Sequence, residues 1–222
     1  PADGYTLLGC NSATHGLNPV IFRKVPYDPI REFTPVSMIG SAPSVLLVHP
    51  SAPMKTTGEL IAYAKANPGK LSMGSSAGGT SQYMSIELLK MMAGVDITPV
   101  PYKGGAPALA DLLGAQIPSM VGALPTVISA IRANRVRALG VTSARRSPQA
   151  PDIPTLAESG VPGFDVTGWN GVCGPAGLPA NVLNKLNADM RKALTTPETV
   201  KRLLEQGIDA EPMTPAQFAA YI

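Results

Sequence analysis

The sequence predicts an α/β protein folded as two lobes. Short strand-like and helix-like segments alternate between residues 56 and 142, which is typical of a mostly parallel sheet covered by helices. Extended segments rich in glycine or proline flank this block at Gly40–Ser44 and Phe164–Cys173, and we expect the chain to cross between lobes there. The first lobe is therefore predicted to comprise residues 1–43 and 164–222, and the second lobe residues 44–163. The 222 residues suffice for two ordinary domains.

The first lobe begins with a strand pattern at Tyr5–Cys10 and a polar turn at Asn11–Gly16. Four prolines between residues 19 and 35 exclude long regular elements there. Two short β-rich runs, Val36–Ile39 and Val45–His49, then surround the first crossing. The chain starts on a strand pattern without a leader, so we expect a signal peptide and the first strand and helix of this lobe to precede it.

Alternating elements build the second lobe. A threonine N-cap at Thr56 or Thr57 and a stop at Asn67–Gly69 define its first helix. A later helix is expected after a Gly/Ser loop, because the apolar residues Met84, Leu88, Met91 and Met92 recur at helical spacing. The remaining expected elements are strand Leu71–Gly74, strand Ile97–Tyr102, helix Ala106–Leu113, strand Ile117–Val121, helix Thr126–Ala133 and strand Val136–Thr142.

After the second crossing the chain returns to the first lobe. Two amphipathic helices are expected at Ala180–Leu194 and Pro197–Gln206. A third helix is expected to start at Pro215 and to continue past Ile222.

The charge pattern bears on the class of partner. The formal net charge is +3, and the 18 Lys and Arg residues are dispersed along the chain. A nucleic-acid interface needs a denser basic stripe with interleaved aromatics, so we expect no nucleic-acid partner. Mild basicity suits an anionic ligand. No apolar stretch approaches the roughly 20 residues of a membrane span, so the chain is not expected to span a membrane.

Cys10 and Cys173 each lie in an apolar, strand-like run. Buried free thiols are the expectation for such residues, ahead of a disulfide between them.

The leading candidate binding site is the loop between a strand and a helix at residues 75–80. Ligands of open α/β sheets lie beyond the carboxyl ends of strands, where helix N-termini offer free N–H groups to anions. Glycines let the backbone approach a ligand, and hydroxyl groups can donate hydrogen bonds. A plain capping turn would need the same residue types. The candidates are Ser75, Ser76, Ala77, Gly78, Gly79 and Thr80.

Two further loops follow predicted strands. Ser12, Thr14 and His15 offer polar groups after the first strand, although an ordinary Asx or Ser/Thr turn explains them as well. Tyr102 and Lys103 could bring an aromatic ring and a cation to a ligand, or form a β-turn with a solvated lysine.

The chain lacks the sequence patterns of several kinds of chemistry. No His/Cys cluster has zinc spacing, no acidic loop resembles a calcium site, and the Ser75–Thr80 loop fits neither a P-loop nor a dinucleotide fingerprint. The pattern Gly-x-Ser-x-Gly occurs at Gly74–Gly78 around Ser76, but His15 and His49 are the only histidines that could serve as its base. We therefore expect binding without catalysis, and neither a metal nor a cofactor.

Taken together, a series of motifs resembles the substrate-binding proteins of tripartite tricarboxylate transporters, also called the Bug receptors. Their order and spacing along the whole chain carry the resemblance. The motifs are Ala2–Leu8, Thr14–Pro19, Tyr27–Pro29, Phe33–Val36, Gly78–Thr80, Pro101–Gly105, Asp111–Gly114, Arg137–Ser143, Pro154–Gly160 and Gly174–Gly177.

The resemblance implies a periplasmic receptor of the type II binding-protein plan. It also implies two α/β lobes that close on a mono-, di- or tricarboxylate, membrane transporter subunits as partners, and ligand-binding loops at Ser75–Thr80 and at Ser12, Thr14 and His15. We expect a monomer. The sequence departs from the family at Tyr83, where a histidine is common, and at Gly122, where an acidic residue is common. The second departure puts amino-acid ligands in doubt, because an ammonium group needs a carboxylate partner.

Two other functions share these features. The ligand-sensing domain of a transcription regulator can have the same two-lobed plan, but a DNA-binding helical segment should then precede it. A hydrolase or transferase could use Ser75 or Ser76 as its nucleophile, and replacing either serine with alanine would then abolish turnover.

Overall fold

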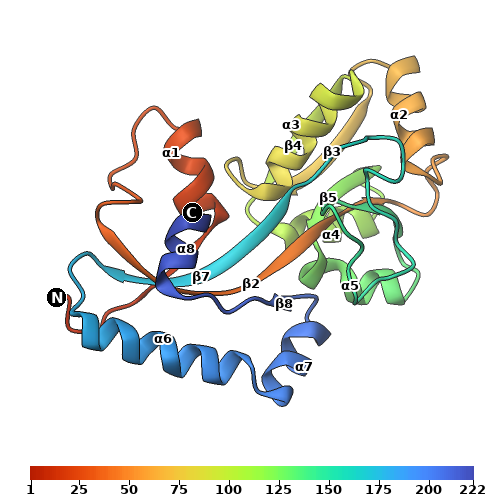
Figure 1. The fold of residues 1–222 in the computed structure, drawn as a ribbon. Helices are drawn as coiled ribbons and strands as arrows, with labels where there is room; N and C mark the ends of the chain where they lie inside the picture. Colours follow the sequence, from red (N-terminus) through yellow and green to blue (C-terminus); the bar gives the residue numbers. More distant parts are fainter. The chain divides into compact units, whose positions relative to one another are not determined.

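The computed structural model describes residues 1–222 and divides into two compact units. Unit 1 contains residues 1–41 and 168–222, and unit 2 contains residues 42–167. The chain thus passes between the units after residues 41 and 167, whereas the sequence predicts crossings after residues 43 and 163. Figure 1 shows the helices and strands of both units.

Unit 2 is built on a mixed five-stranded sheet. Its strand order is β6-β2-β5-β3-β4. Strand β3 runs parallel to β4 and β5, whereas β2 runs antiparallel to β5 and β6. Four of the five strands therefore point in one direction, and their carboxyl ends lie at one edge of the sheet. The strands are β2 (Phe33–Val48), β3 (Leu71–Ser76), β4 (Ile97–Tyr102), β5 (Ser119–Ala123) and β6 (Arg137–Val141).

Strand β2 corrects the expectation of two short runs separated by a hinge. It continues from Phe33 to Val48 through Pro43. A proline cannot donate to a strand ladder, so it is tolerated in a strand only where no partner needs its N–H group. Pro43 meets this condition because it lies between Gly40–Ser41, which pair with β8, and Ser44–Val48, which pair with β5.

Helices cover both faces of this sheet. Alternate residues of β2 point to opposite faces, so Leu46 and Val48 join one buried cluster while Val45 and Leu47 join the other. Helices α2 and α3 pack on the first face, and α4 and α5 pack on the second. The helices are α2 (Thr57–Ala66), α3 (Ser81–Ala93), α4 (Gly105–Leu113) and α5 (Leu124–Arg132).

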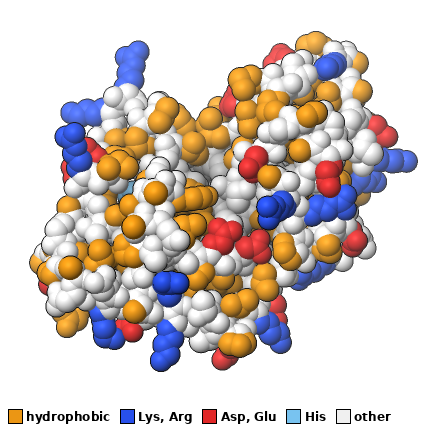
Figure 2. Space-filling view, in the orientation of Figure 1, with side chains coloured by type: hydrophobic (Ala, Val, Ile, Leu, Met, Phe, Trp, Pro, Cys, Tyr) orange, Lys and Arg blue, Asp and Glu red, His pale blue; other side chains and the backbone are white.

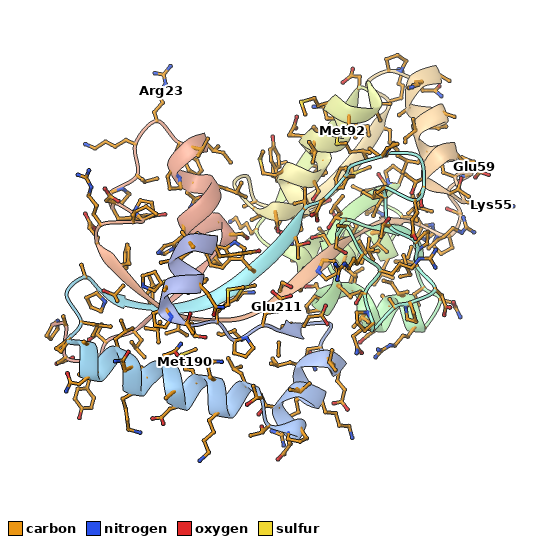
Figure 3. The ribbon with its side chains drawn as sticks, viewed as in Figure 1. Arg23, Lys55, Glu59, Met92, Met190 and Glu211 are labelled. Atoms are coloured by element: carbon orange, nitrogen blue, oxygen red, sulfur yellow. A yellow bond between two sulfur atoms is a disulfide. The ribbon has the colours of Figure 1, made fainter.

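The four residues whose spacing predicts helix α3 are not its most buried ones, although Leu88 packs partly buried against the core. Ile86 and Leu89 are its buried apolar residues, whereas Met91 is 73% exposed. Met92, labelled near the end of the helix in Figure 3, is also exposed. Those four residues recur with the same helical period as Ile86 and Leu89. The spacing therefore predicts a helix without showing which residues face the core.

Unit 1 combines a second set of strands with the terminal helices. Strand β1 (Leu8–Asn11) pairs antiparallel with β7 (Thr167–Pro175), which neighbours β2, and β8 (Asp209–Ala210) also pairs with β2. Asn187 on helix α6 (Ala180–Leu194) donates to the carbonyls of Val36 and Met213. The other helices are the π-helix η1 (Ser12–Leu17), α1 (Asn18–Ile21), α7 (Pro197–Glu205) and α8 (Pro215–Tyr221).

The small core of unit 1 contains a disulfide between Cys10 and Cys173, so the expectation of free thiols is wrong. In the β1–β7 register Cys10 is opposite Gly171, two residues before Cys173, which places both cysteines on the same face of neighbouring strands. Their Cα atoms are 6.0 Å apart, within the range that a disulfide spans. Trp169 and Phe218 pack in the same core, edge to face at 5.4 Å.

No helix of the structure has both the length and the apolar character needed to cross a membrane.

Candidate functional site

The carboxyl ends of three neighbouring strands bring polar groups together in unit 2. Ser76 ends β3, Gly105 begins the helix after β4, and Thr126 lies in the first turn of the helix after β5. A Cβ atom at Gly105 would lie 3.6 Å from the Thr126 hydroxyl and 3.7 Å from the Ser76 hydroxyl. Two hydroxyl groups therefore converge beside an exposed backbone segment at the sheet edge where α/β proteins bind ligands.

Within the predicted loop, two residues serve the fold. Ser75 is fully buried, and its hydroxyl donates to the Ser76 carbonyl at 2.9 Å. Thr80 is the N-cap of α3: its hydroxyl accepts from the Tyr83 amide at 3.3 Å and donates to the Ala77 carbonyl at 2.8 Å. The capping alternative is thus realised at Thr80, which fixes the start of the helix next to the loop.

The middle of the same loop faces solvent. Ala77 and Gly78 are exposed, and Ser76 is half-buried. No heavy atom lies within 4 Å of the position that a Cβ atom would take on Gly78. Gly79 has φ +83, a conformation that favours glycine. The backbone of this segment is open to a ligand, and the first turn of α3 directly behind it has amide groups without partners in the helix.

The loop after β4 contributes differently from the expectation. The Tyr102 hydroxyl donates to the Asp111 carboxylate at 2.8 Å, so it is engaged by helix α4. Burial, together with the neighbouring Asp111 carboxylate, raises the pKa of Tyr102. Lys103 is exposed, and Gly104 has φ +146, which lets the chain turn into α4.

A buried polar network borders this edge of the sheet. Gln82, in the first turn of α3, donates to the Ser44 hydroxyl at 3.1 Å. The Thr142 hydroxyl accepts from the Ser44 amide at 2.9 Å and donates to the Val166 carbonyl at 2.7 Å. The sequence analysis missed Gln82, Ser44 and Thr126. Thr126 could have been found, because it lies just after the end of strand β5, as Ala77–Thr80 lie just after the end of β3.

In unit 1 the predicted turn is a capped π-helix. The Asn11 side chain accepts from the amides of Ala13 and Thr14, while the Thr14 hydroxyl accepts from the Asn11 amide at 3.1 Å. Tyr27 donates to the Thr14 carbonyl at 2.8 Å. Asn11 and Tyr27 are positioning residues that the sequence analysis did not single out. Ser12 is half-buried at the start of η1.

His15 is buried, with 4% of its surface exposed. Its Nδ1 atom lies 2.9 Å from the Thr14 hydroxyl, and its ring packs edge to face on Phe33 at 5.1 Å. Burial lowers the pKa of His15, because the charged form loses its hydration. The buried Nε2 atom has no hydrogen-bond partner.

Charged side chains do not form a dense stripe on the face drawn in Figure 2. Lys and Arg are dispersed among apolar and uncharged groups there. Salt bridges such as Arg146–Glu158 at 2.9 Å pair some of these charges locally.

The structure has the two-unit α/β fold of periplasmic binding proteins. Residues 1–222 match the family described as "Tripartite tricarboxylate transporter family receptor". The chain belongs to this family, as the sequence motifs indicated.

Relatives of known sequence agree with this assignment. A Pseudomonas protein encoded between tcbD and tcbE is 41% identical over 94% of this chain and 62% of its own length. Protein BugT of Bordetella pertussis is 34% identical over 100% of this chain and 68% of its own length. The chain thus spans about two thirds of these relatives.

Three solved structures have the same fold over 100% of this chain. Rpa4515 of R. palustris, solved with adipate, has a TM-score of 0.94, 37% identity and 74% of its length covered. MatC from Rhodopseudomonas palustris, with bound malate, has a TM-score of 0.89, 32% identity and 76% covered. The periplasmic binding protein BugD has a TM-score of 0.90, 30% identity and 74% covered.

Proposed function

We propose that this chain is the solute-binding receptor of a tripartite tricarboxylate-type uptake system. In this role it captures a small organic carboxylate in the periplasm and delivers it, chemically unchanged, to membrane transporter subunits. The observation that carries the proposal is the exposed Ala77–Gly78 backbone just after the carboxyl end of β3, in a chain that matches the receptor family throughout.

Dicarboxylates are the first ligand class to consider. Adipate and malate, which the R. palustris structures contain, each have two carboxylate groups. A chain that is 37% and 32% identical to those proteins supports the same class here, although the two acids differ in length and in the malate hydroxyl group. Mono- and tricarboxylates belong in the same test.

We assign one carboxylate group to the loop of unit 2. The Ser76 hydroxyl and the amides around Gly78 and the start of α3 supply hydrogen-bond donors, and the helix dipole favours a negative charge. Thr126 adds a second hydroxyl beside Gly105. Ser75, Gly79 and Thr80 hold the loop in shape, and Lys103 and Tyr102 border it.

Ser12, Thr14 and His15 are proposed to contribute the binding residues of unit 1. Thr14 and His15 are tied into the η1 cap and the core beneath it, so their contribution is to position the turn. Ser12, at the start of η1, is the residue that we assign to ligand contact.

Gly122 supports an acid without an ammonium group as ligand. A Cβ atom there would lie 2.6 Å from Val127 Cγ1, so a side chain at this position would collide with α5, and the chain has no carboxylate here for an ammonium group. The binding role also fits the position of His49 better than catalysis by Ser76 does, because His49 follows β2 at the opposite end of the sheet from Ser76. No observation in the structure favours the ligand-sensing domain of a transcription regulator.

A glycine substitution tests the assigned loop. Gly78→Ala adds a methyl group into open space at a position without a positive φ, so its stability should change by about 1 kcal/mol or less. If a carboxylate lies against this backbone, the affinity should fall about tenfold or more, which corresponds to about 1.4 kcal/mol. Calorimetric titration of both proteins with each acid that binds the unmodified protein measures the two affinities.

Gly58→Ala is the matched control. Gly58 lies on α2, which follows the opposite end of the sheet, and its Cβ position is also uncrowded. This variant should bind like the unmodified protein. Equal affinity of the Gly78→Ala variant would remove the loop from the site.

A further inference from the structure

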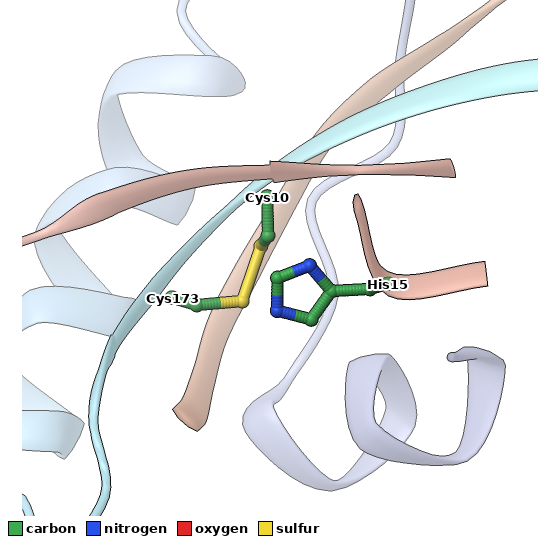
Figure 4. Close-up of side chains that lie close together, drawn as sticks. All are labelled: Cys10, His15 and Cys173. Carbon is green, nitrogen blue, oxygen red and sulfur yellow. A yellow bond between two sulfur atoms is a disulfide. The ribbon is translucent and has the colours of Figure 1, made fainter. Parts of the chain in front are cut away.

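Three potential metal ligands lie close together in the core of unit 1. Cys10 of β1, Cys173 of β7 and His15 of η1 place their sulfur and ring nitrogen atoms within 4.8 Å of one another. All three residues are buried, at 1%, 0% and 4% exposure respectively. Figure 4 shows the His15 ring beside the sulfur of Cys173, with a nitrogen-bearing edge toward it.

The hydrogen bonding of His15 leaves one lone pair free. Thr14 Oγ1, at 2.9 Å from Nδ1, can accept a hydrogen bond from a protonated Nδ1, because the threonine hydroxyl can donate its own hydrogen bond to the Asn11 carbonyl at 3.3 Å. In this tautomer Nε2 carries no proton. It is buried without a partner, which is costly for a polar atom and needs an explanation. An imidazole whose other nitrogen is held by a hydrogen bond is the arrangement found in metal-binding histidines.

We propose that the reduced protein binds a Zn²⁺ ion through the thiolates of Cys10 and Cys173 and Nε2 of His15. Two thiolates and one imidazole suit this ion, and three protein ligands leave a fourth position for water. The disulfide and the metal site exclude each other, since the same sulfur atoms form both. The spacing of the cysteines does not indicate this site, because they are separated by 163 positions and the pairing of β1 with β7 brings them together.

The chemistry balances in two steps. A phosphine reductant gives two electrons to the disulfide, becomes a phosphine oxide with an oxygen atom from water, and the two protons of that water complete the two thiols. Zn²⁺ then replaces both thiol protons, which are released to solvent. His15 binds as the neutral imidazole and releases none.

The test uses the full-length protein, reduced with a phosphine under anaerobic conditions and freed of reductant. Co²⁺ serves as the spectroscopic probe and Zn²⁺ as its competitor. We expect one Co²⁺ per chain with a thiolate-to-cobalt charge-transfer band, complete displacement by one equivalent of Zn²⁺, and a higher melting temperature of the reduced protein with Zn²⁺. The oxidised protein should show none of these effects.

His15→Ala separates the proposed site from binding to two thiols alone. It should weaken Zn²⁺ affinity of the reduced protein by about 100-fold and change the cobalt spectrum. His49→Ala is the matched control, because His49 lies in unit 2, and it should have no effect. If reduction unfolds the protein, Zn²⁺ should restore its circular dichroism. The proposal is overturned if His15→Ala binds as tightly as the unmodified protein, or if Zn²⁺ neither binds the reduced chain nor stabilises it.

Discussion

Single hydroxyl groups hold distant segments of unit 2 together at the edge that carries the candidate site. Thr142 is fully buried and bonds both the Ser44 amide and the Val166 carbonyl. Threonine and valine have nearly the same shape, but valine would leave both backbone groups without a partner in the interior. The hydroxyl, and not the volume, is therefore the property that this position needs.

Thr142→Val should lower the free energy of unfolding by about 1–3 kcal/mol, the cost of unsatisfied buried groups. Chemical denaturation followed by circular dichroism measures this. Thr98→Val is the matched control, because Thr98 is exposed and its hydroxyl makes only a 3.3 Å bond to the Gly69 carbonyl. Equal stability of the two variants would contradict the role assigned to Thr142.

Glu158 provides a pH-dependent contribution. The Thr155 amide and then Arg146 hold the pKa of its carboxyl below the ordinary value of 4.5. A lowered folded-state pKa means that the contribution is present above pH 4.5 and is lost as the pH falls through the folded value. Glu158→Gln should therefore show a shallower loss of melting temperature between neutral pH and pH 3 than the unmodified protein. Parallel curves would rule out this contribution.

Residues that act locally could be predicted from the sequence, and residues that act at a distance could not. Thr56 and Thr80 cap helices within three residues of their own positions. The burial of His15 depends on Phe33, and the network at Ser44 depends on Thr142, 98 positions away. Such pairings follow from strand register, which a single sequence does not reveal.

At the scale of elements, α3 connects the candidate loop to the core of unit 2. Its N-terminus is fixed by Thr80, and its buried face packs Ile86 and Leu89 against the sheet. The opposite side carries exposed methionines. The packing of this buried face therefore determines how firmly the helix holds the loop.

Leu89→Ala should destabilise the protein by about 2–5 kcal/mol, because it creates a cavity in a packed core. Met91→Ala, two positions away and 73% exposed, should change stability by no more than about 0.5 kcal/mol. Thermal and denaturant unfolding of both variants measure the difference. A larger loss of stability for Met91→Ala than for Leu89→Ala would contradict this assignment of the buried face.

The bounds of several elements were predictable, because their signals are local. Strand Ile97–Tyr102 and helix Ala180–Leu194 have the predicted limits. The continuous β2 was not predictable, since Pro43 normally interrupts a strand and only the partners on either side make it acceptable. The sequence predicts a turn where the π-helix η1 forms, because its six residues contain no long apolar period.

At the scale of the whole molecule, the family motifs and the fold lead to the same account. Two units, each with its own core, carry the loops that the sequence singled out. The pairing of Cys10 with Cys173 was the main feature of the whole chain that the sequence did not predict. It depends on the pairing of β1 with β7, which come from the two separate chain segments that form unit 1.

The central claim is that the chain binds a small organic carboxylate, and a thermal-shift screen of the full-length protein tests it most directly. The screen should contain adipate, malate, other mono-, di- and tricarboxylates, and amino acids, with calorimetry on each acid that shifts the transition. We predict a dose-dependent rise in melting temperature with at least one carboxylate, because a ligand that binds only the folded state stabilises it. No shift with any carboxylate would contradict the receptor account.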